Sequence, residues 1–150
     1  MPTEYAHTNI ISQDWEKLAK FYINVFDCKP LSPERDESGE WLEKGTAVKN
    51  AHLKGVHLRL PGCGDDGPTL EIYSYHEMLD KPARPAANRK GLGHLAFRVD
   101  DVKAKLDEIV HHGGHPLGDI VTSEVEGAGT ITFTYATDPE GNIIEVQNWK

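Results

Sequence analysis

Hydrophobic and polar positions follow two periods along this chain, and both periods recur in the same order in each half. Apolar residues two positions apart indicate strands over residues 6–12 and 92–99, because alternate side chains of a strand share a face. Apolar residues three and four apart predict helices directly afterwards, over residues 14–26 and 101–112. Further extended segments are predicted at 29–34, 53–60, 68–75, 116–125, 130–137 and 142–149, with a short helical turn at 39–48. The chain therefore contains a predicted β-α-β-β-β unit twice.

The two units also agree residue by residue. His7 in the first unit aligns with His94 in the second, and Glu71 with its apolar neighbours aligns with Glu145 and its neighbours. One unit alone would leave a half-buried sheet, so the two copies are expected to pack as one body. The predicted fold is α+β and forms a single domain over residues 1–150. Its module one spans about 4–75, its linker about 76–91 and its module two about 92–150.

The composition and net charge of the chain exclude some classes of binding partner. The chain has 24 acidic and 16 basic residues and a formal net charge of −8, which argues against nucleic acid and anionic membranes as ligands. No apolar run is long enough to span a membrane and no secretion signal is present, so a cytoplasmic protein is expected. Cys28 and Cys63 have no CxxC partner and are expected to be reduced thiols. The composition therefore disfavours nucleic acid and membranes as partners, and the small-molecule substrate expected below rests on a family resemblance.

Four ligand-type residues occupy equivalent places in the two units. Strand alternation places His7, Glu71, His94 and Glu145 on the sheet faces that point away from the helices. A glutamate between apolar strand residues is unfavourable unless something pairs with it. Two imidazoles and two carboxylates would satisfy one divalent ion such as Ni, Co, Zn, Mn or Fe(II). The alternatives are hydrogen-bonded structural histidines, and acids that pair with Arg59 or Arg98.

Two other features suggest chemistry less strongly. The histidines of segment 111–115 resemble a metal cluster, but Gly113 and Gly114 end the helix that such a pair would need. Imidazoles near a helix C-terminus also interact favourably with the helix dipole, so a solvated cap is expected there. The cysteines lack basic neighbours, which disfavours a nucleophile.

Several segments resemble a known family. Segments 6–8 and 93–97, which carry the two histidines, and segments 70–72 and 138–145, which carry the two acids, look like the vicinal oxygen chelate superfamily. The resemblance covers essentially the whole chain. It implies curved mixed sheets around a central cavity, with metal ligands on the first and last strand of each module. The ligands carried over are His7, Glu71, His94 and Glu145.

The order His-Glu-His-Glu is similar to that of bacterial glyoxalase I. Methylmalonyl-CoA epimerases have Gln where Glu71 stands, while extradiol dioxygenases and fosfomycin-resistance enzymes use three protein ligands. Bleomycin-binding members lack the set. One departure concerns the first strand, where bacterial glyoxalase I usually has an Arg that holds glutathione and this chain has Asn9, Ile10, Ile11 and Ser12. The resemblance therefore implies glyoxalase-type chemistry more firmly than it implies glutathione as the substrate.

The expected activity is that of a metal-dependent lyase or isomerase acting through an enediolate. Glu145 or Glu71 would move the proton at the carbon next to a metal-bound carbonyl. The side chains expected to bind substrate are Arg98, Arg59, Asn9 and Tyr73, although a surface ion pair is the simpler role for Arg59. The alternatives are an epimerase of an acyl-CoA or related acid, an extradiol-type dioxygenase, and a non-catalytic resistance protein. A homodimer is also expected from the resemblance.

Overall fold

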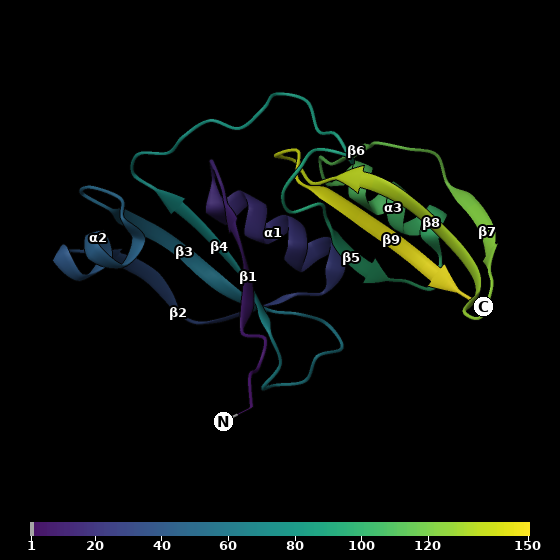
Figure 1. Ribbon diagram of the computed structural model, residues 1–150, viewed down its shortest axis with the longest axis horizontal. Coiled ribbons are helices and arrows are strands. Elements are labelled where there is room, and N and C mark those ends of the chain that lie inside the picture. Colours follow the sequence, from purple (N-terminus) through teal and green to yellow (C-terminus); the bar gives the residue numbers. More distant parts are fainter. Residues whose placement is uncertain (1) are drawn as a thin grey trace. The chain divides into compact units, whose positions relative to one another are not determined.

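The computed structural model describes residues 2–150 and divides the chain into two compact units. The first unit ends at Lys81 and the second begins at Pro82, inside the segment 76–91 that was predicted to be the linker. Each unit contains one mixed sheet with a long helix beside it (Figure 1). The α+β fold, with its repeated β-α-β-β-β order, is thereby confirmed. That the two modules pack as one body stays a prediction.

The first unit is a four-stranded sheet in the order β1-β4-β3-β2. Strand β1 runs parallel to β4, and the other neighbours are antiparallel. The elements are β1 (His7–Ile11), α1 (Trp15–Phe26), β2 (Lys29–Ser38), α2 (Glu40–Thr46), β3 (His52–Arg59) and β4 (Thr69–Tyr75). Helix α1 lies against one face of this sheet, as Figure 1 shows. The opposite face carries the candidate site.

The second unit repeats this arrangement with the order β5-β9-β8-β6, and β7 pairs with the other part of β8. Strand β5 runs parallel to β9, just as β1 runs parallel to β4. The elements are β5 (Leu95–Arg98), α3 (Val102–His111), β6 (His115–Pro116), β7 (Val121–Val125), β8 (Gly129–Thr137) and β9 (Ile143–Trp149). The sequence repeat is therefore also a repeat of topology.

The two long helices begin in the same way. Asp14 and Asp101, which align in the two halves, are the N-caps of α1 and α3, and their carboxylates accept hydrogen bonds from the backbone of the first turn. Such a bond satisfies one of the backbone N–H groups that a helix start leaves without a partner. Helix α3 ends before Gly113, as predicted, and the φ of 94° at this glycine is a left-handed conformation that often follows a helix.

Apolar burial follows the predicted alternation. On β4, Leu70 and Ile72 are fully buried toward α1, where Leu18 and Tyr22 meet the sheet. The same alternation turns Glu71 to the other face, where it is still only 7% exposed. The buried acid is thus a consequence of strand period rather than of an irregularity.

Three predicted boundaries differ from the structure. The strand predicted at 92–99 begins at Leu95, because Gly91 and Gly93 weaken an extended segment, and His94 lies immediately before the strand. The strand predicted at 116–125 is interrupted, since the backbone N–H groups of Leu117 and Gly118 both donate to the carbonyl of Tyr135. The strand predicted at 29–34 continues to Ser38 after an irregular register.

The turn before β9 is organised by a single carboxylate. Asp138 is fully buried, and its side chain accepts hydrogen bonds from the backbone N–H of Glu140 at 2.9 Å, from that of Asn142 at 3.0 Å and from Nδ2 of Asn142 at 2.8 Å. Asp138 thereby sets where β9 begins. Glu145 follows in that strand.

Replacing the buried Asp138 with alanine is expected to lower the free energy of unfolding by about 3 kcal/mol, because three partly buried donors lose a charged acceptor. Urea unfolding followed by circular dichroism measures this loss. The exposed Asp119 provides a control, and its replacement by alanine should change stability by less than about 0.5 kcal/mol. Equal unfolding midpoints for the two variants would contradict the role given to Asp138.

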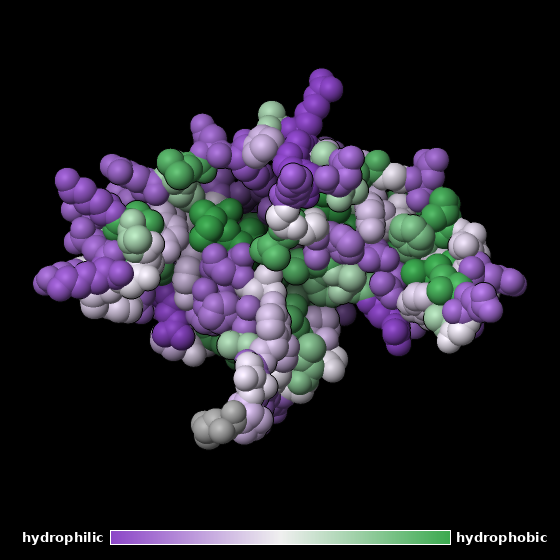
Figure 2. Space-filling model, in the orientation of Figure 1, coloured by the Kyte–Doolittle hydropathy of each residue, from purple (hydrophilic) through white to green (hydrophobic). Residues whose placement is uncertain are grey.

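The visible surface in Figure 2 is largely hydrophilic, with hydrophobic side chains in scattered groups. Among the exposed apolar residues are Trp41, Leu79 and Leu92. In the described part of the chain, no helix is both long and apolar enough to cross a membrane.

Candidate functional site

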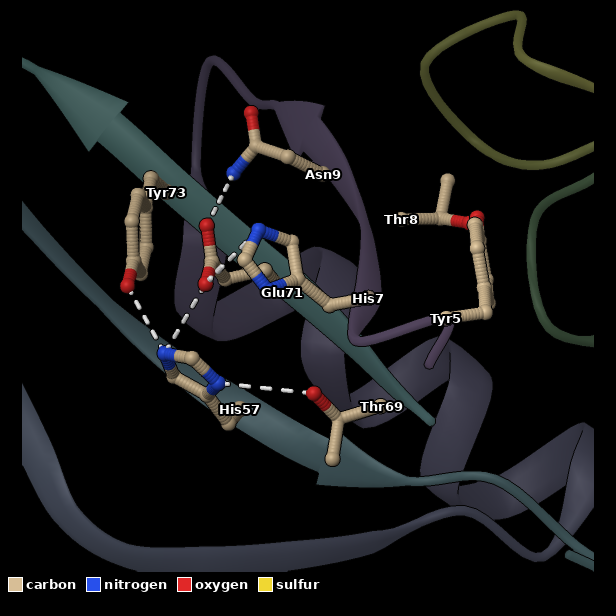
Figure 3. A network of polar contacts seen from close by, with 8 residues as sticks. All are labelled: Tyr5, His7, Thr8, Asn9, His57, Thr69, Glu71 and Tyr73. Atoms are coloured by element: carbon tan, nitrogen blue, oxygen red, sulfur yellow. Dashed lines mark hydrogen bonds and ion pairs between the residues drawn. The ribbon is translucent and has the colours of Figure 1, made fainter. Parts of the chain in front are cut away.

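The face of the first sheet opposite α1 brings together polar side chains from three strands. Asn9 on β1, Glu71 on β4 and His57 on β3 lie opposite one another in register, and paired residues point to the same face. His7 lies two residues before Asn9 and points the same way. Figure 3 shows these side chains converging on the carboxylate of Glu71.

The carboxylate of Glu71 is surrounded by nitrogen atoms. Nδ2 of Asn9 donates to Oε1 at 3.0 Å, while Nε2 of His57 lies 3.1 Å from Oε2 and Nε2 of His7 lies 3.5 Å from that same oxygen. The hydroxyl of Tyr73 is 2.8 Å from Nε2 of His57. These contacts offset the cost of burying an acid within a strand.

Burial changes the acidity of two members of this network. Burial lowers the pKa of His57, and the charges of Arg35 and His7 lower it further. The charge of Glu71 acts in the opposite direction but does not outweigh burial. Burial also raises the pKa of Tyr73, and the charge of Glu71 adds to that effect. At neutral pH the neutral imidazole and the protonated phenol are therefore favoured.

The second unit repeats the pair in a simpler form. Nε2 of His94 lies 3.0 Å from Oε2 of Glu145, and Nε2 of Gln147 donates to Oε1 at 3.2 Å. Ala96 stands opposite Glu145 on β5, where the first unit has Asn9 opposite Glu71. Glu145 is 9% exposed. It therefore has fewer side-chain donors than Glu71.

Comparison with known proteins identifies the family of the chain. The sequence profile of the glyoxalase/bleomycin resistance protein/dioxygenase superfamily matches residues 4–146. The chain belongs to this superfamily. The family resemblance stated from the sequence motifs is confirmed, and so are the mixed sheets and the α+β fold class that it implied.

Three relatives illustrate the range of this superfamily. A probable lactoylglutathione lyase of Vibrio cholerae is 30% identical over 148 residues, covering 95% of this chain and 88% of the relative. A glyoxalase family protein of Bacillus cereus has a crystal structure with a TM-score of 0.75 at 16% identity, covering 98% of this chain and 93% of that one. The fosfomycin resistance protein FosX of Listeria monocytogenes, crystallised with Mn(II) and sulfate, has a TM-score of 0.59 at 15% identity and covers 100% and 95%. The two structures support the shared fold.

In this structure the four predicted metal ligands form two pairs, one in each unit. His7 contacts Glu71 in the first unit, and His94 contacts Glu145 in the second. Over residues 2–150, no three His, Cys, Asp or Glu side chains are arranged as a metal-binding group. Each unit therefore presents a two-ligand pair.

The predicted substrate-binding residues have different surroundings. Asn9 donates to Glu71, and Tyr73 contacts His57, so both support the carboxylate network. Arg59 pairs with Asp65 at 3.3 Å, which is the simpler role considered for it. Arg98 is exposed on β5, on the same face as Gln147. That any of the four binds substrate stays a prediction.

Sequence reasoning missed His57 as a contact of Glu71. The two residues are equally distant from the middle of the loop that joins β3 and β4. The equal spacing from the loop could have indicated this pairing in the sequence. A long loop, however, does not by itself define the register of the strands that it joins.

The structure also explains the histidines of segment 111–115 and the cysteines, for which the sequence did not favour a chemical role. Nδ1 of His112 lies 2.9 Å from the carbonyl oxygen of Glu108, which is a helix-end contact. Burial raises the pKa of Cys28 to about 12, so this thiol stays protonated at neutral pH.

Proposed function

We propose that this protein is a divalent-metal-dependent lyase or isomerase of the glyoxalase I type, which moves a proton at a carbon next to a carbonyl. The observation that carries the proposal is the repeated pair. Each unit holds an imidazole Nε2 within 3.5 Å of a nearly buried carboxylate, at positions that correspond in the sequence repeat. Two such pairs at matching positions favour a shared chemical role over two unrelated structural contacts.

The four side chains fit a divalent cation as a donor set. Two imidazole nitrogens and two carboxylate oxygens suit Ni, Co, Zn, Mn or Fe(II). His7 and His94 retain 43% and 30% exposure of their side chains, so both rings can be reached from solvent. A bound cation would act as a Lewis acid toward the carbonyl oxygen of the substrate. The crystallisation of Listeria FosX with Mn(II) supports a divalent ion.

Glu145 is the better candidate to move the proton. Its two oxygens have one side-chain donor each, from His94 and Gln147. Glu71 has Asn9 on one oxygen and two histidines on the other, which hold it more firmly as an acceptor. We therefore propose that Glu145 takes the proton from the substrate carbon and delivers it to the adjacent carbon, while Glu71 serves mainly as a ligand.

A substrate screen tests this function. Protein freed of metal with a chelator and reloaded with each divalent ion is assayed on hemithioacetals and on 2-methyl acyl-CoA thioesters. We expect turnover that depends on the added ion. Similarity to the probable lactoylglutathione lyase of V. cholerae makes the hemithioacetals the expected substrates of the two classes. Return of the proton to its original carbon would identify an epimerase. Oxygen consumption with a catechol, or no metal-dependent turnover, would contradict the proposal.

A further inference from the structure

Arg35 extends the polar face of the first sheet beyond the network around Glu71. It lies on β2 opposite Gly55 of β3, which lies opposite Tyr73 of β4, so Arg35 and Tyr73 share a face with Glu71. The register of β2 shifts between Leu31 and Arg35. Such irregularities often re-aim a side chain within a sheet.

Within the described residues, no hydrogen bond or ion pair joins the guanidinium of Arg35 to a protein acceptor. Its Nε is buried without a hydrogen-bond partner, and within residues 2–150 no ion pair joins Arg35 to a carboxylate. Glu37 shares the face two residues further along β2 but is not paired with it. Nε of Arg59 is also buried and unpartnered, although that guanidinium reaches Asp65 through another nitrogen. Arg35 thus combines a buried, unpartnered guanidinium nitrogen with the lack of an ion pair to any described carboxylate.

Gly55 prevents the neighbouring strand from supplying a partner. A Cβ at this position would lie 2.1 Å from the carbonyl oxygen of Ile72 and 2.4 Å from Cδ1 of Tyr73. Any side chain there would force the sheet or the Tyr73 ring to move. The place opposite Arg35 therefore stays without a side chain.

We propose that Arg35 binds an oxyanion, a carboxylate or a phosphate, that belongs to the substrate. A guanidinium presents parallel N–H groups that match two oxygens of such a group. A guanidinium that no described carboxylate neutralises gains charge-assisted hydrogen bonds when an oxyanion binds to it.

This inference rests on the proposed function, because it places the oxyanion relative to Glu71. Two strand spacings separate β2 from β4, which is about 10 Å, and Glu71 lies about 7 Å further along the strands. An extended arginine side chain covers much of that span. The substrate class is therefore a short acid whose oxyanion lies a few bonds from the carbonyl oxygen that an ion held by Glu71 would bind.

The test uses metal-free full-length protein. Sodium phosphate and sodium propionate are titrated separately at constant ionic strength, and the backbone amides of Gly55 and Tyr73 are followed by ¹H–¹⁵N NMR. We expect saturable shifts with at least one of the two anions, and the more effective one identifies the source of the oxyanion. Arg35→Gln should weaken that binding about tenfold or more. Arg89→Gln in the linker is the matched control and should leave the binding unchanged.

Two further variants and one kinetic readout keep the proposal testable. If Arg35→Gln does not fold, Arg35→Lys replaces it and should weaken binding, because an ammonium lacks the planar fork. In the active enzyme, the Arg35 substitution should raise KM for an anionic substrate much more than it lowers kcat. Unaltered anion binding in both Arg35 variants, or shifts that never saturate, would overturn the proposal. Because the titration needs neither metal nor turnover, loss of the proposed function would leave its result intact.

Discussion

Replacing His94 with alanine is expected to abolish tight metal binding and to reduce turnover to background. The substitution removes the imidazole whose Nε2 lies 3.0 Å from Glu145, so the second unit retains a single ligand. Loss of one nitrogen ligand from a four-ligand set weakens affinity severely, and the remaining carboxylate would also lose its nearest nitrogen donor. Metal content by elemental analysis and initial rates on the best substrate of the screen measure both effects.

The matched control for this experiment is His111→Ala. His111 is an exposed histidine at the end of α3, in the same unit as His94, and its ring contacts His112. Its removal should leave metal content and turnover at the wild-type values. A His94→Ala protein that retained the wild-type ratio of metal to chain would contradict the assignment of His94 as a ligand.

Replacing Glu145 with glutamine is expected to lower turnover by about 10²- to 10⁴-fold, the usual contribution of a positioned general acid or base. Glutamine keeps the shape of the side chain and one carbonyl oxygen, but it cannot accept the proton at neutral pH. The fold should be preserved, because the apolar neighbours Ile144 and Val146 remain fully buried. Steady-state kinetics together with the far-UV circular dichroism spectrum separate a chemical defect from a folding defect.

Two glutamates serve as comparisons. Glu124→Gln changes an exposed residue of β7 and should leave the kinetics unchanged. Glu71→Gln should weaken metal binding and turnover, with turnover recovering more at high metal concentration than in Glu145→Gln. If Glu145→Gln kept its activity while Glu71→Gln lost it at saturating metal, the roles given to the two acids would be reversed.

The features that the sequence predicted well are those set by short-range periods. Alternation placed Glu71 on the face opposite Leu70 and Ile72, and the structure confirms that placement. The matching caps at Asp14 and Asp101 also follow from local preference. Because the two halves of the sequence align, each prediction made for one half also applied to the other.

The features that were missed depend on register and on long-range packing. His57 meets Glu71 because of how β3 pairs with β4 across a loop whose length does not reveal the register. The position of Arg35 depends on an irregularity in β2, for which its sequence offers no clear signal. Arg59 pairs with Asp65 of a turn, and contacts of exposed side chains with turns have no periodic pattern.

The central claim is that the His–Glu pairs of both units bind a divalent ion. The most direct test is elemental analysis of untagged protein after reconstitution with each candidate ion and removal of loosely bound metal. The account predicts that one ion is retained at about one per chain, and that His7→Ala and His94→Ala each lose it. Wild-type protein that retained no divalent ion, or variants that both kept it at the wild-type ratio, would contradict the account.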